Sequence, residues 1–321
     1  MHKGVIPLIA LIIGFIVAIL VALGWNDNPL VKLLPTPTPE VTLALPPTPT
    51  PTAIPTPTAK PSPKPTPTIK PSPVPTSTPI APAVSGPPGT GLSTITVATE
   101  LGNFRATVLS LDMGSTRMIT ETGNDGDCGS GCVTLPLATY VSRNGGFAGV
   151  NGTYFCPAAY PECSGKTDSF DFPVYNTRLG HWINSNTLGW NGRAIFYTDG
   201  SGAHYQQNSA GFGGGLNAGI INYPGLVDGG NVQIDSNQSG LSDKQKGVGT
   251  KVGIGTRNPS NVMVVIAYSV NMQQFAYVFK ALGATGALNL DDGGSTALYY
   301  QGRYVAGPGR NLPNSVVFAP K

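Results

Sequence analysis

The chain has 321 residues, of which only 11% are charged, and its formal net charge is +3. The positive excess lies before residue 89, where five lysines face two acidic residues; the remainder carries 14 basic and 14 acidic side chains. The absence of a basic run or patch argues against nucleic acid as a partner. The remainder, about 230 residues, is long enough for one domain with a full core.

Residues 1–24 are expected to form a transmembrane anchor. Residues 5–23 are apolar apart from Gly and one Pro and carry no charge, and about 20 apolar residues can cross the hydrocarbon core of a membrane. A cleaved signal peptide is the alternative, because Ala22-Leu23-Gly24 offers small residues for cleavage; the apolar part of such peptides is usually only about 7–15 residues. Lys3 and Asp27 flank the segment and predict a single-pass cell-membrane protein whose C-terminal domain is extracellular.

Residues 25–92 are expected to be a disordered linker rich in Pro, Thr and Ser. The repetitive part, 35–88, contains runs such as Pro46-Pro47-Thr48-Pro49-Thr50-Pro51. Proline fixes φ and lacks an N–H, so this part can form neither helix nor sheet and should be an extended spacer. At about 3.1 Å per residue it would reach at most on the order of 170 Å. Its many hydroxyls are also typical of an O-glycosylated stalk.

Residues 93–321 are expected to form a single β-rich α+β domain with a few short helices. Turn signals such as Asp199-Gly200, Asp228-Gly229-Gly230 and Asn258-Pro259 separate short β-type runs. Helices are predicted at 134–144, which two glycines close, and at 271–282, whose apolar residues recur at helical spacing and predict core packing. The predicted strands are 93–98, 104–111, 194–198, 219–222, 262–267, 287–290, 297–300 and 315–319.

All four cysteines lie close together in the sequence. Cys128 and Cys132 flank a Gly-Ser-Gly segment, and Cys156 and Cys163 flank a loop that contains proline. A metal site would need four thiolates in a small closed arrangement, and these spacings are loose for one, with no histidine nearby. Outside a membrane, two disulfides are favoured. Pairing within each local couple is the simplest of three connectivities, and the sequence does not choose among them.

The segment 288–298 is the most informative candidate site. It reads Leu-Asn-Leu-Asp-Asp-Gly-Gly-Ser-Thr-Ala-Leu, so that an apolar, strand-like start leads to Asp291 and Asp292, two glycines and two hydroxyls. By itself, such a turn is typical of a β-hairpin. A carboxylate on a glycine-rich turn can also meet a ligand closely, because glycine has no Cβ and accepts positive φ.

Three other segments could carry chemistry. The run 149–155 places Asn151 and Tyr154 around Gly152; it contains a glycosylation sequon, and an Asx-type turn is the alternative interpretation. Lys251 heads a predicted strand, where a lysine is usually just solvated. Arg310 precedes the last predicted strand and could form a bidentate pair with a phosphate or carboxylate.

Taken together, these segments resemble the phosphodiester glycosidase family. The matching blocks are the Asn-Gly-x-Tyr-Phe run at 151–155, the Pro-x-Leu-Val strand at 224–229, the strand at 251–255, and the closing blocks at 289–298 and 310–318. The resemblance runs from about residue 93 to the end and excludes the tail. Two positions depart from the family pattern, which usually has glycine where this chain has Asp292 and arginine where it has Lys251.

The resemblance implies cleavage of a sugar–phosphate bond on the sugar side, in surface or exopolymer glycans. Asp291 would be the base or nucleophile beside an oxocarbenium-like transition state, and Asp292 stands next to it. Lys251 and Arg310 would neutralise the departing phosphate. The residues expected to bind substrate, by holding sugar hydroxyls, bonding the phosphate or allowing close approach, are Asn151, Gly152, Tyr154, Gly293, Gly294, Ser295 and Asn314.

The resemblance implies no cofactor. A second carboxylate at Asp292 could repel Asp291, raise one pKa or bind a cation; Ca²⁺ would suit adjacent acids, but no set of further ligands supports it. The expected partners are a carbohydrate or glycan-phosphate substrate and the membrane, and the oligomeric state stays open. Two other classes remain as alternatives: a non-catalytic glycan-binding module on a stalk, and a structural wall protein.

Overall fold

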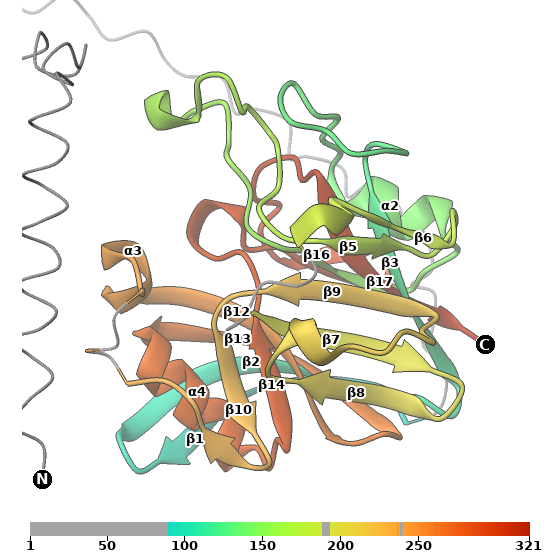
Figure 1. Ribbon diagram of the computed structural model, residues 1–321. Coiled ribbons are helices and arrows are strands. Elements are labelled where there is room, and N and C mark those ends of the chain that lie inside the picture. Colours follow the sequence, from blue (N-terminus) through green and yellow to red (C-terminus); the bar gives the residue numbers. More distant parts are fainter. Residues whose placement is uncertain (1–88, 188–192, 236, 238–239) are drawn as a thin grey trace, which may run out of the picture. The chain divides into compact units, whose positions relative to one another are not determined.

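The computed structural model describes residues 89–321 except 188–192, 236 and 238–239. The predicted anchor and almost all of the predicted linker therefore lie outside the described residues. No helix within the described ranges is long and apolar enough to cross a membrane. The first strand begins at Gly91, just before the predicted domain start at residue 93. The described part has many strands and few, short helices (Figure 1), which confirms the predicted β-rich α+β class.

The largest sheet has seven antiparallel strands in the order β1-β2-β13-β12-β14-β10-β11. The turns predicted from Asn258-Pro259 and Asp228-Gly229-Gly230 connect β12 to β13 and β10 to β11. The strands are β1 (Gly91–Thr99), β2 (Gly102–Asp112), β10 (Gly225–Asp228), β11 (Asn231–Val232), β12 (Gly249–Asn258), β13 (Asn261–Val270) and β14 (Gly286–Asn289).

Two further antiparallel sheets have five strands each. The second sheet runs β16-β15-β4-β17-β3 and the third runs β6-β5-β9-β7-β8. The second is built from β3 (Thr116–Thr122), β4 (Ala148–Asn151), β15 (Leu298–Tyr300), β16 (Arg303–Ala306) and β17 (Asn314–Pro320). The third is built from β5 (Val174–Asn176), β6 (His181–Ile183), β7 (Ala194–Asp199), β8 (Gly202–Gln206) and β9 (Ala218–Asn222).

The helices are short. The α-helices are α2 (Leu137–Arg143), α3 (Asp243–Lys246) and α4 (Met272–Ala281), and single 3₁₀ turns are η2 (Pro161–Cys163), η3 (Ser185–Thr187), η4 (Ser209–Gly211) and η5 (Gly293–Ser295). Both predicted helices are present, as α2 and α4. A reciprocal pair of hydrogen bonds between Asn271 and Gln274 caps the start of α4, and Gly283, with φ of +80°, follows its end.

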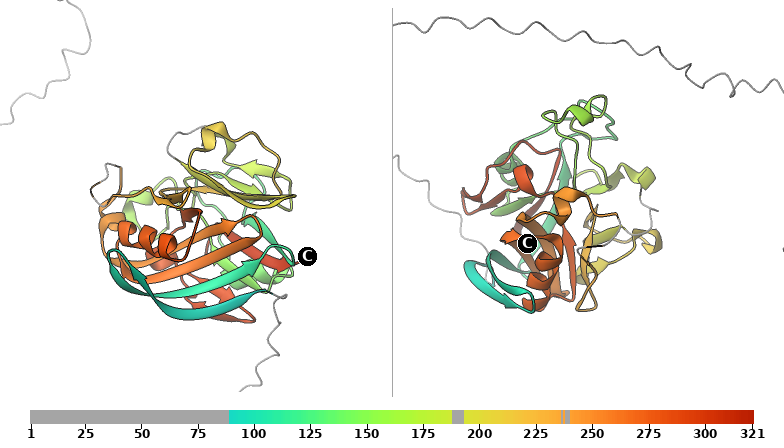
Figure 2. Two further views of the ribbon diagram at one scale, coloured as in Figure 1. Left: turned by 90° about the horizontal axis from the view of Figure 1, so that it is seen from below. Right: turned by 90° about the vertical axis from the view of Figure 1, so that its left-hand side faces the viewer.

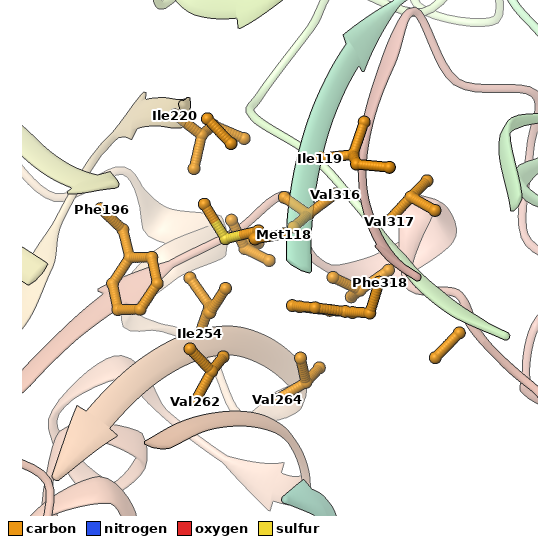
Figure 3. Close-up of a cluster of buried hydrophobic side chains, with 14 of the residues drawn as sticks. Met118, Ile119, Phe196, Ile220, Ile254, Val262, Val264, Val316, Val317 and Phe318 are labelled. Carbon is orange, nitrogen blue, oxygen red and sulfur yellow. The ribbon is translucent and has the colours of Figure 1, made fainter. Parts of the chain in front are cut away.

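The seven-stranded sheet separates two hydrophobic clusters. Because side chains alternate along a strand, Met263 and Val265 of β13 pack against α4, whereas Val262 and Val264 point to the other side, toward the two smaller sheets. Figure 2 shows α4 lying along one face of the large sheet. Figure 3 shows the second cluster, where all three sheets contribute side chains: Met118, Ile119, Phe196, Ile220, Ile254, Val262, Val264, Val316, Val317 and Phe318.

Two of the three glycines of β12, Gly253 and Gly255, permit the close approach of α4. A Cβ atom on Gly253 would lie 3.0 Å from the ring of Phe279 and 3.1 Å from that of Phe275, and one on Gly255 would lie 2.9 Å from Phe279. Larger side chains would therefore push the helix off the sheet. The two glycines after Lys251 therefore serve helix packing. By letting α4 pack closely on β12, they help to hold the strand near whose start Lys251 lies.

The segment 288–298 is not a hairpin. The strand β14 ends at Asn289 in the seven-stranded sheet, and β15 begins at Leu298 in the second sheet. Between them the chain leaves one sheet, forms the single turn η5 and enters the other. The hairpin alternative is therefore wrong, and Asp291 and Asp292 lie on this crossing between two sheets.

The four cysteines form two disulfides, Cys128–Cys132 and Cys156–Cys163. This confirms pairing within each local couple, and no cysteine is free. The second disulfide closes a loop that contains Tyr160 and η2. That loop borders the pocket that contains the candidate site.

Candidate active site

A pocket of about 580 Å³ brings together most of the predicted site residues. Tyr154 comes from the loop after β4, Lys251 from the start of β12, Asp291 and Asp292 from the crossing after β14, and Arg310 from the loop before β17. Residues from segments far apart in the sequence thus converge on one cavity. The predicted binding residues of the crossing also line it, namely Gly293, Gly294 and Ser295.

Asn151, Gly152 and Asn314 do not line the pocket, which corrects the expectation that they bind substrate directly. Asn151 is fully buried; its Nδ2 donates to the backbone oxygen of Asp291 at 2.5 Å, and its Oδ1 accepts from the N–H of Ala297 at 3.0 Å. The oxygen of Gly152 accepts from the N–H of Asp291 at 2.9 Å. These bonds hold both ends of the crossing, so Asn151 fixes the backbone that carries the carboxyls.

Asn314 supports the same backbone from the neighbouring strand. It is 1% exposed, and its Oδ1 accepts from the N–H of Thr153 at 2.8 Å. A Cβ atom on Gly152 would collide with this amide, which is why glycine is needed between Asn151 and Thr153. The Asn-Gly block is therefore a scaffold beneath the pocket, and the buried Asn151 side chain is not an accessible glycosylation site in the folded domain.

Asp291 is a buried carboxyl with a strongly altered proton affinity. Its residue is 7% exposed, and its Oδ2 has no hydrogen-bond partner. Burial is the main cause that raises the pKa of Asp291 to about 8; the charge of Asp292 adds to the rise, whereas a hydrogen bond from Ser295 and the charge of Arg310 oppose it. Perturbed carboxyls in a pocket are typical of functional sites.

Asp292 forms an ion pair inside the pocket. Its Oδ2 lies 3.0 Å from Nζ of Lys251, and Lys251 is only 3% exposed. Burial raises the pKa of Asp292, and the positive charge of Lys251 opposes that shift. Lys251 also donates to the backbone oxygen of Lys244 at 3.0 Å. The two positions expected to depart from the family pattern, Lys251 and Asp292, are therefore in direct contact with each other.

Tyr154 lines the pocket, and its hydroxyl is held by two amide side chains. Its oxygen accepts from Nδ2 of Asn289 at 2.6 Å and from Nε2 of Gln245 at 3.2 Å. Burial first, then the charge of Asp292, raise the pKa of Tyr154 well above its usual value, so it keeps its proton. With both lone pairs engaged, the hydroxyl can act toward a further group only as a donor.

Arg310 crosses the glycine turn. Its backbone N–H donates to the oxygen of Gly294 at 3.2 Å, and a Cβ atom on Gly294 would collide with the guanidinium group. Glycine at this position therefore allows the arginine to lie over the turn. The guanidinium carbon lies 5.2 Å from the ring centre of Tyr160. Ser295 is buried beneath this turn and lies close to Asp291.

Sequence reasoning missed several residues of the pocket wall. Tyr160, Asp171, Lys244 and Gln245 all line it, and burial raises the pKa of Asp171. The run Ser242-Asp243-Lys244-Gln245 is a capping-box sequence, and the structure shows the corresponding hydrogen bonds at the start of α3. That signal could have predicted a helix start. No local pattern indicates that these loops meet at one pocket.

The arrangement combines a carboxyl that can hold a proton, an ion-paired carboxylate, a hydroxyl donor and several cations. Such a set suits a sugar with an attached anionic group: the carboxyls can serve the reacting carbon and the cations the anion. Within residues 89–321, as far as they are described, no group of three or more His, Cys, Asp or Glu side chains is placed to hold a metal ion.

Comparison with known structures reveals similar folds at low sequence identity. The catalytic domain of zebrafish N-acetylglucosamine-1-phosphodiester α-N-acetylglucosaminidase matches with a TM-score of 0.56 and 14% identity, over 75% of this chain and 87% of that one. A hypothetical protein from Synechocystis matches with a TM-score of 0.50 and 13% identity, over 73% of this chain. The match spans only 62% of the Synechocystis chain. No curated protein sequence matches significantly.

The family comparison covers the part of the chain that forms the pocket. The family model described as "Phosphodiester glycosidase" matches residues 144–319, more than half of the chain. The matched region begins before Asn151 and ends after Asn314, so it contains the crossing, the scaffold beneath it and Arg310. The chain therefore belongs to the phosphodiester glycosidase family.

Proposed function

We propose that this protein hydrolyses a glycosyl phosphodiester, breaking the bond between the anomeric carbon of the sugar and the phosphate oxygen. The observation that carries the proposal is the placement of the buried Asp291 carboxyl in one pocket with Arg310 and Tyr154. Asp291 supplies the carboxyl for the anomeric carbon, Arg310 supplies the cation for the leaving phosphate, and Tyr154 supplies a hydroxyl donor. Family membership agrees with a hydrolase of this class.

Asp291 acts in its ionised form. As a base, it takes a proton from a water molecule whose oxygen bonds to the anomeric carbon; as a nucleophile, it bonds to that carbon itself before water replaces it. In either case the phosphate leaves with the electrons of the carbon–oxygen bond. Because a phosphate is a weakly basic leaving group, it needs little help from a general acid.

Asp292 adds negative charge near the developing positive charge on the sugar, and its ion pair with Lys251 holds it in place. The Tyr154 hydroxyl, fixed by two amide donors, positions a sugar oxygen. Asn151 and Asn314 contribute indirectly, by fixing the backbone under the carboxyls. Some residues of the predicted site thus contact the substrate, and others hold those residues in position.

We further propose that the protein works at the cell surface on surface or exopolymer glycans. Residues 1–24 would anchor it in the membrane and residues 25–92 would hold the domain at a distance, as their composition predicts. The two disulfides support an oxidising, extracellular environment. The N-acetylglucosaminidase activity in the name of the zebrafish protein makes N-acetylglucosamine the first sugar to test.

The test is turnover of sugar 1-phosphate methyl diesters by the full-length protein in H₂¹⁸O, beginning with the N-acetylglucosamine compound. We expect ¹⁸O in the released sugar and none in the phosphate. Label in the phosphate would refute cleavage on the sugar side. Binding without turnover would favour the glycan-binding module.

Two variants test the assignment of the site. Asp291→Asn keeps the shape of the side chain and should lower kcat by about 10³-fold or more. Asp228→Asn is the matched control, because Asp228 is exposed and lies outside the pocket; it should retain full activity. If Asp291→Asn retained turnover, the enzyme would stand but its catalytic carboxyl would lie elsewhere.

A further inference from the structure

The three cationic side chains that line the pocket differ in whether another protein group already balances their charge. Lys251 is buried, pairs with Asp292 at 3.0 Å and donates to the backbone oxygen of Lys244. Lys244 and Arg310, in contrast, form no ion pair with any residue that the structure describes. Lys251 thus has its charge balanced within the protein, whereas the charges of Lys244 and Arg310 are available to a ligand.

Lys244 and Arg310 meet on the same aromatic ring. Nζ of Lys244 lies 4.1 Å from the ring centre of Tyr160, and the guanidinium carbon of Arg310 lies 5.2 Å from it. Both distances are within the range of cation–π attraction. All three residues line the pocket that contains Asp291. A single ring therefore brings two cations together without neutralising either.

We infer that Lys244, Tyr160 and Arg310 form the site that binds the phosphate of the substrate, while Lys251 serves to hold Asp292. This inference rests on the proposed function. It keeps Arg310, which belongs to the closing motif, and adds Lys244 and Tyr160, which no motif contains. An anionic phosphate oxygen binds favourably to ammonium and guanidinium groups, and the planar guanidinium can offer two parallel donors.

The surrounding structure holds each member of this site in place. The disulfide Cys156–Cys163 closes the loop that carries Tyr160. The missing Cβ of Gly294 leaves room for Arg310. The bond from Lys251 to the backbone of Lys244 fixes α3, and Gln245 of the same helix bonds the hydroxyl of Tyr154. The phosphate site is thereby connected to the wall of the sugar site.

The pair Lys244 and Lys246 offers a sharp binding experiment. Both lysines are exposed on α3, but only Lys244 lines the pocket. Inorganic phosphate is titrated into the full-length protein by calorimetry. We expect Lys244→Gln to weaken phosphate binding about tenfold and Lys246→Gln, which removes the same charge, to weaken it less than twofold. Equal losses in the two variants, or no loss in Lys244→Gln, would overturn the inference.

Variants of Tyr160 test whether the ring organises the cations. Tyr160→Phe keeps the ring and should bind phosphate as the parent does, whereas Tyr160→Leu should weaken binding about fivefold. Circular dichroism shows whether each variant is folded. If Tyr160→Leu were folded and bound phosphate normally, the ring would have no part in the site.

Kinetics separate this inference from the proposed function. For a glycosyl phosphodiester, Lys244→Gln should raise KM about tenfold and leave kcat within about twofold. For an aryl glycoside of the same sugar, which has no phosphate, both constants should stay unchanged. An equal loss on both substrates would overturn the inference and leave the hydrolase intact. If no substrate is turned over, the proposed function fails, and phosphate binding still decides the inference.

Discussion

Replacing Asp292 by glycine, the residue expected at this position from the resemblance to the family, should shift the pH dependence of activity to lower pH. Burial is the main cause that raises the pKa of Asp291 to about 8, and the charge of Asp292 adds to it. Asp292 also pairs with Lys251, so its removal leaves an unbalanced cation in the same pocket. Both changes favour the ionised form of Asp291.

The size of the effect follows from the fraction of Asp291 that is ionised. With a pKa of about 8, about a tenth of the enzyme carries the active carboxylate at pH 7. Burial remains after the substitution, so we expect a partial shift of about one pH unit. The ionised fraction at pH 7 then rises about fivefold, to about a half, so kcat/KM at pH 7 rises about fivefold relative to its own plateau above pH 9. The plateau itself should fall, because the negative charge of Asp292 no longer assists the sugar.

The assay is kcat/KM for a glycosyl phosphodiester between pH 5 and pH 10. If kcat/KM of the parent protein decreased as pH rose through about 8, Asp291 would act as an acid and not in its ionised form. Lys251→Met gives the opposite perturbation, because it removes the cation and leaves Asp292; its rising limb should move to higher pH. A limb that does not move in Asp292→Gly, or moves upward, would refute the electrostatic coupling of the two carboxyls.

Three further predictions concern stability and packing. A carboxyl whose pKa rises from 3.8 to about 8 on folding lowers the free energy of unfolding more and more as pH rises between those values. Asp291→Asn should therefore raise Tm at pH 8 and leave it unchanged at pH 4. Equal changes in Tm at the two pH values would contradict this. Gly294→Ala should displace Arg310 and raise KM about tenfold for the phosphodiester but not for an aryl glycoside. Glu121→Gln removes a buried charge that lies 2.6 Å from the partly exposed Arg143 and should cost about 1.5 kcal/mol in urea unfolding, whereas Glu100→Gln, in an exposed pair, should cost less than about 1 kcal/mol.

The sequence was a good guide to the strands with continuous apolar content. The predicted runs at 104–111, 262–267 and 315–319 lie within β2, β13 and β17. It did not reveal β3, whose sequence Thr-Arg-Met-Ile-Thr-Glu-Thr reads as polar and half exposed. In the structure β3 is largely buried, because Glu121 is paired with Arg143 and the hydroxyl of Thr120 bonds the neighbouring third sheet. Such burial depends on partners distant in sequence, which local patterns do not encode.

The candidate site was predictable where its residues lie on one motif. Asp291 and its glycine turn line the pocket as expected. Asn151 belongs to an equally recognisable motif, but its side chain is used within the fold, and a motif does not distinguish a residue that contacts substrate from one that supports the contact. Lys244 and Tyr160 lie in loops without a signature, and only the tertiary fold brings them together.

The crossing between the sheets gives the pocket a mechanical role. A ligand there would lie against Asp292, which is paired with Lys251 of the seven-stranded sheet, and against Tyr154 on the loop after a strand of the second sheet. A bound ligand would therefore bridge the seven-stranded sheet and the second sheet. A ligand at a hundred times its Kd adds about 2.7 kcal/mol to stability. That contribution would slow backbone amide exchange in β12 and β4 together, so that the two layers open as one unit.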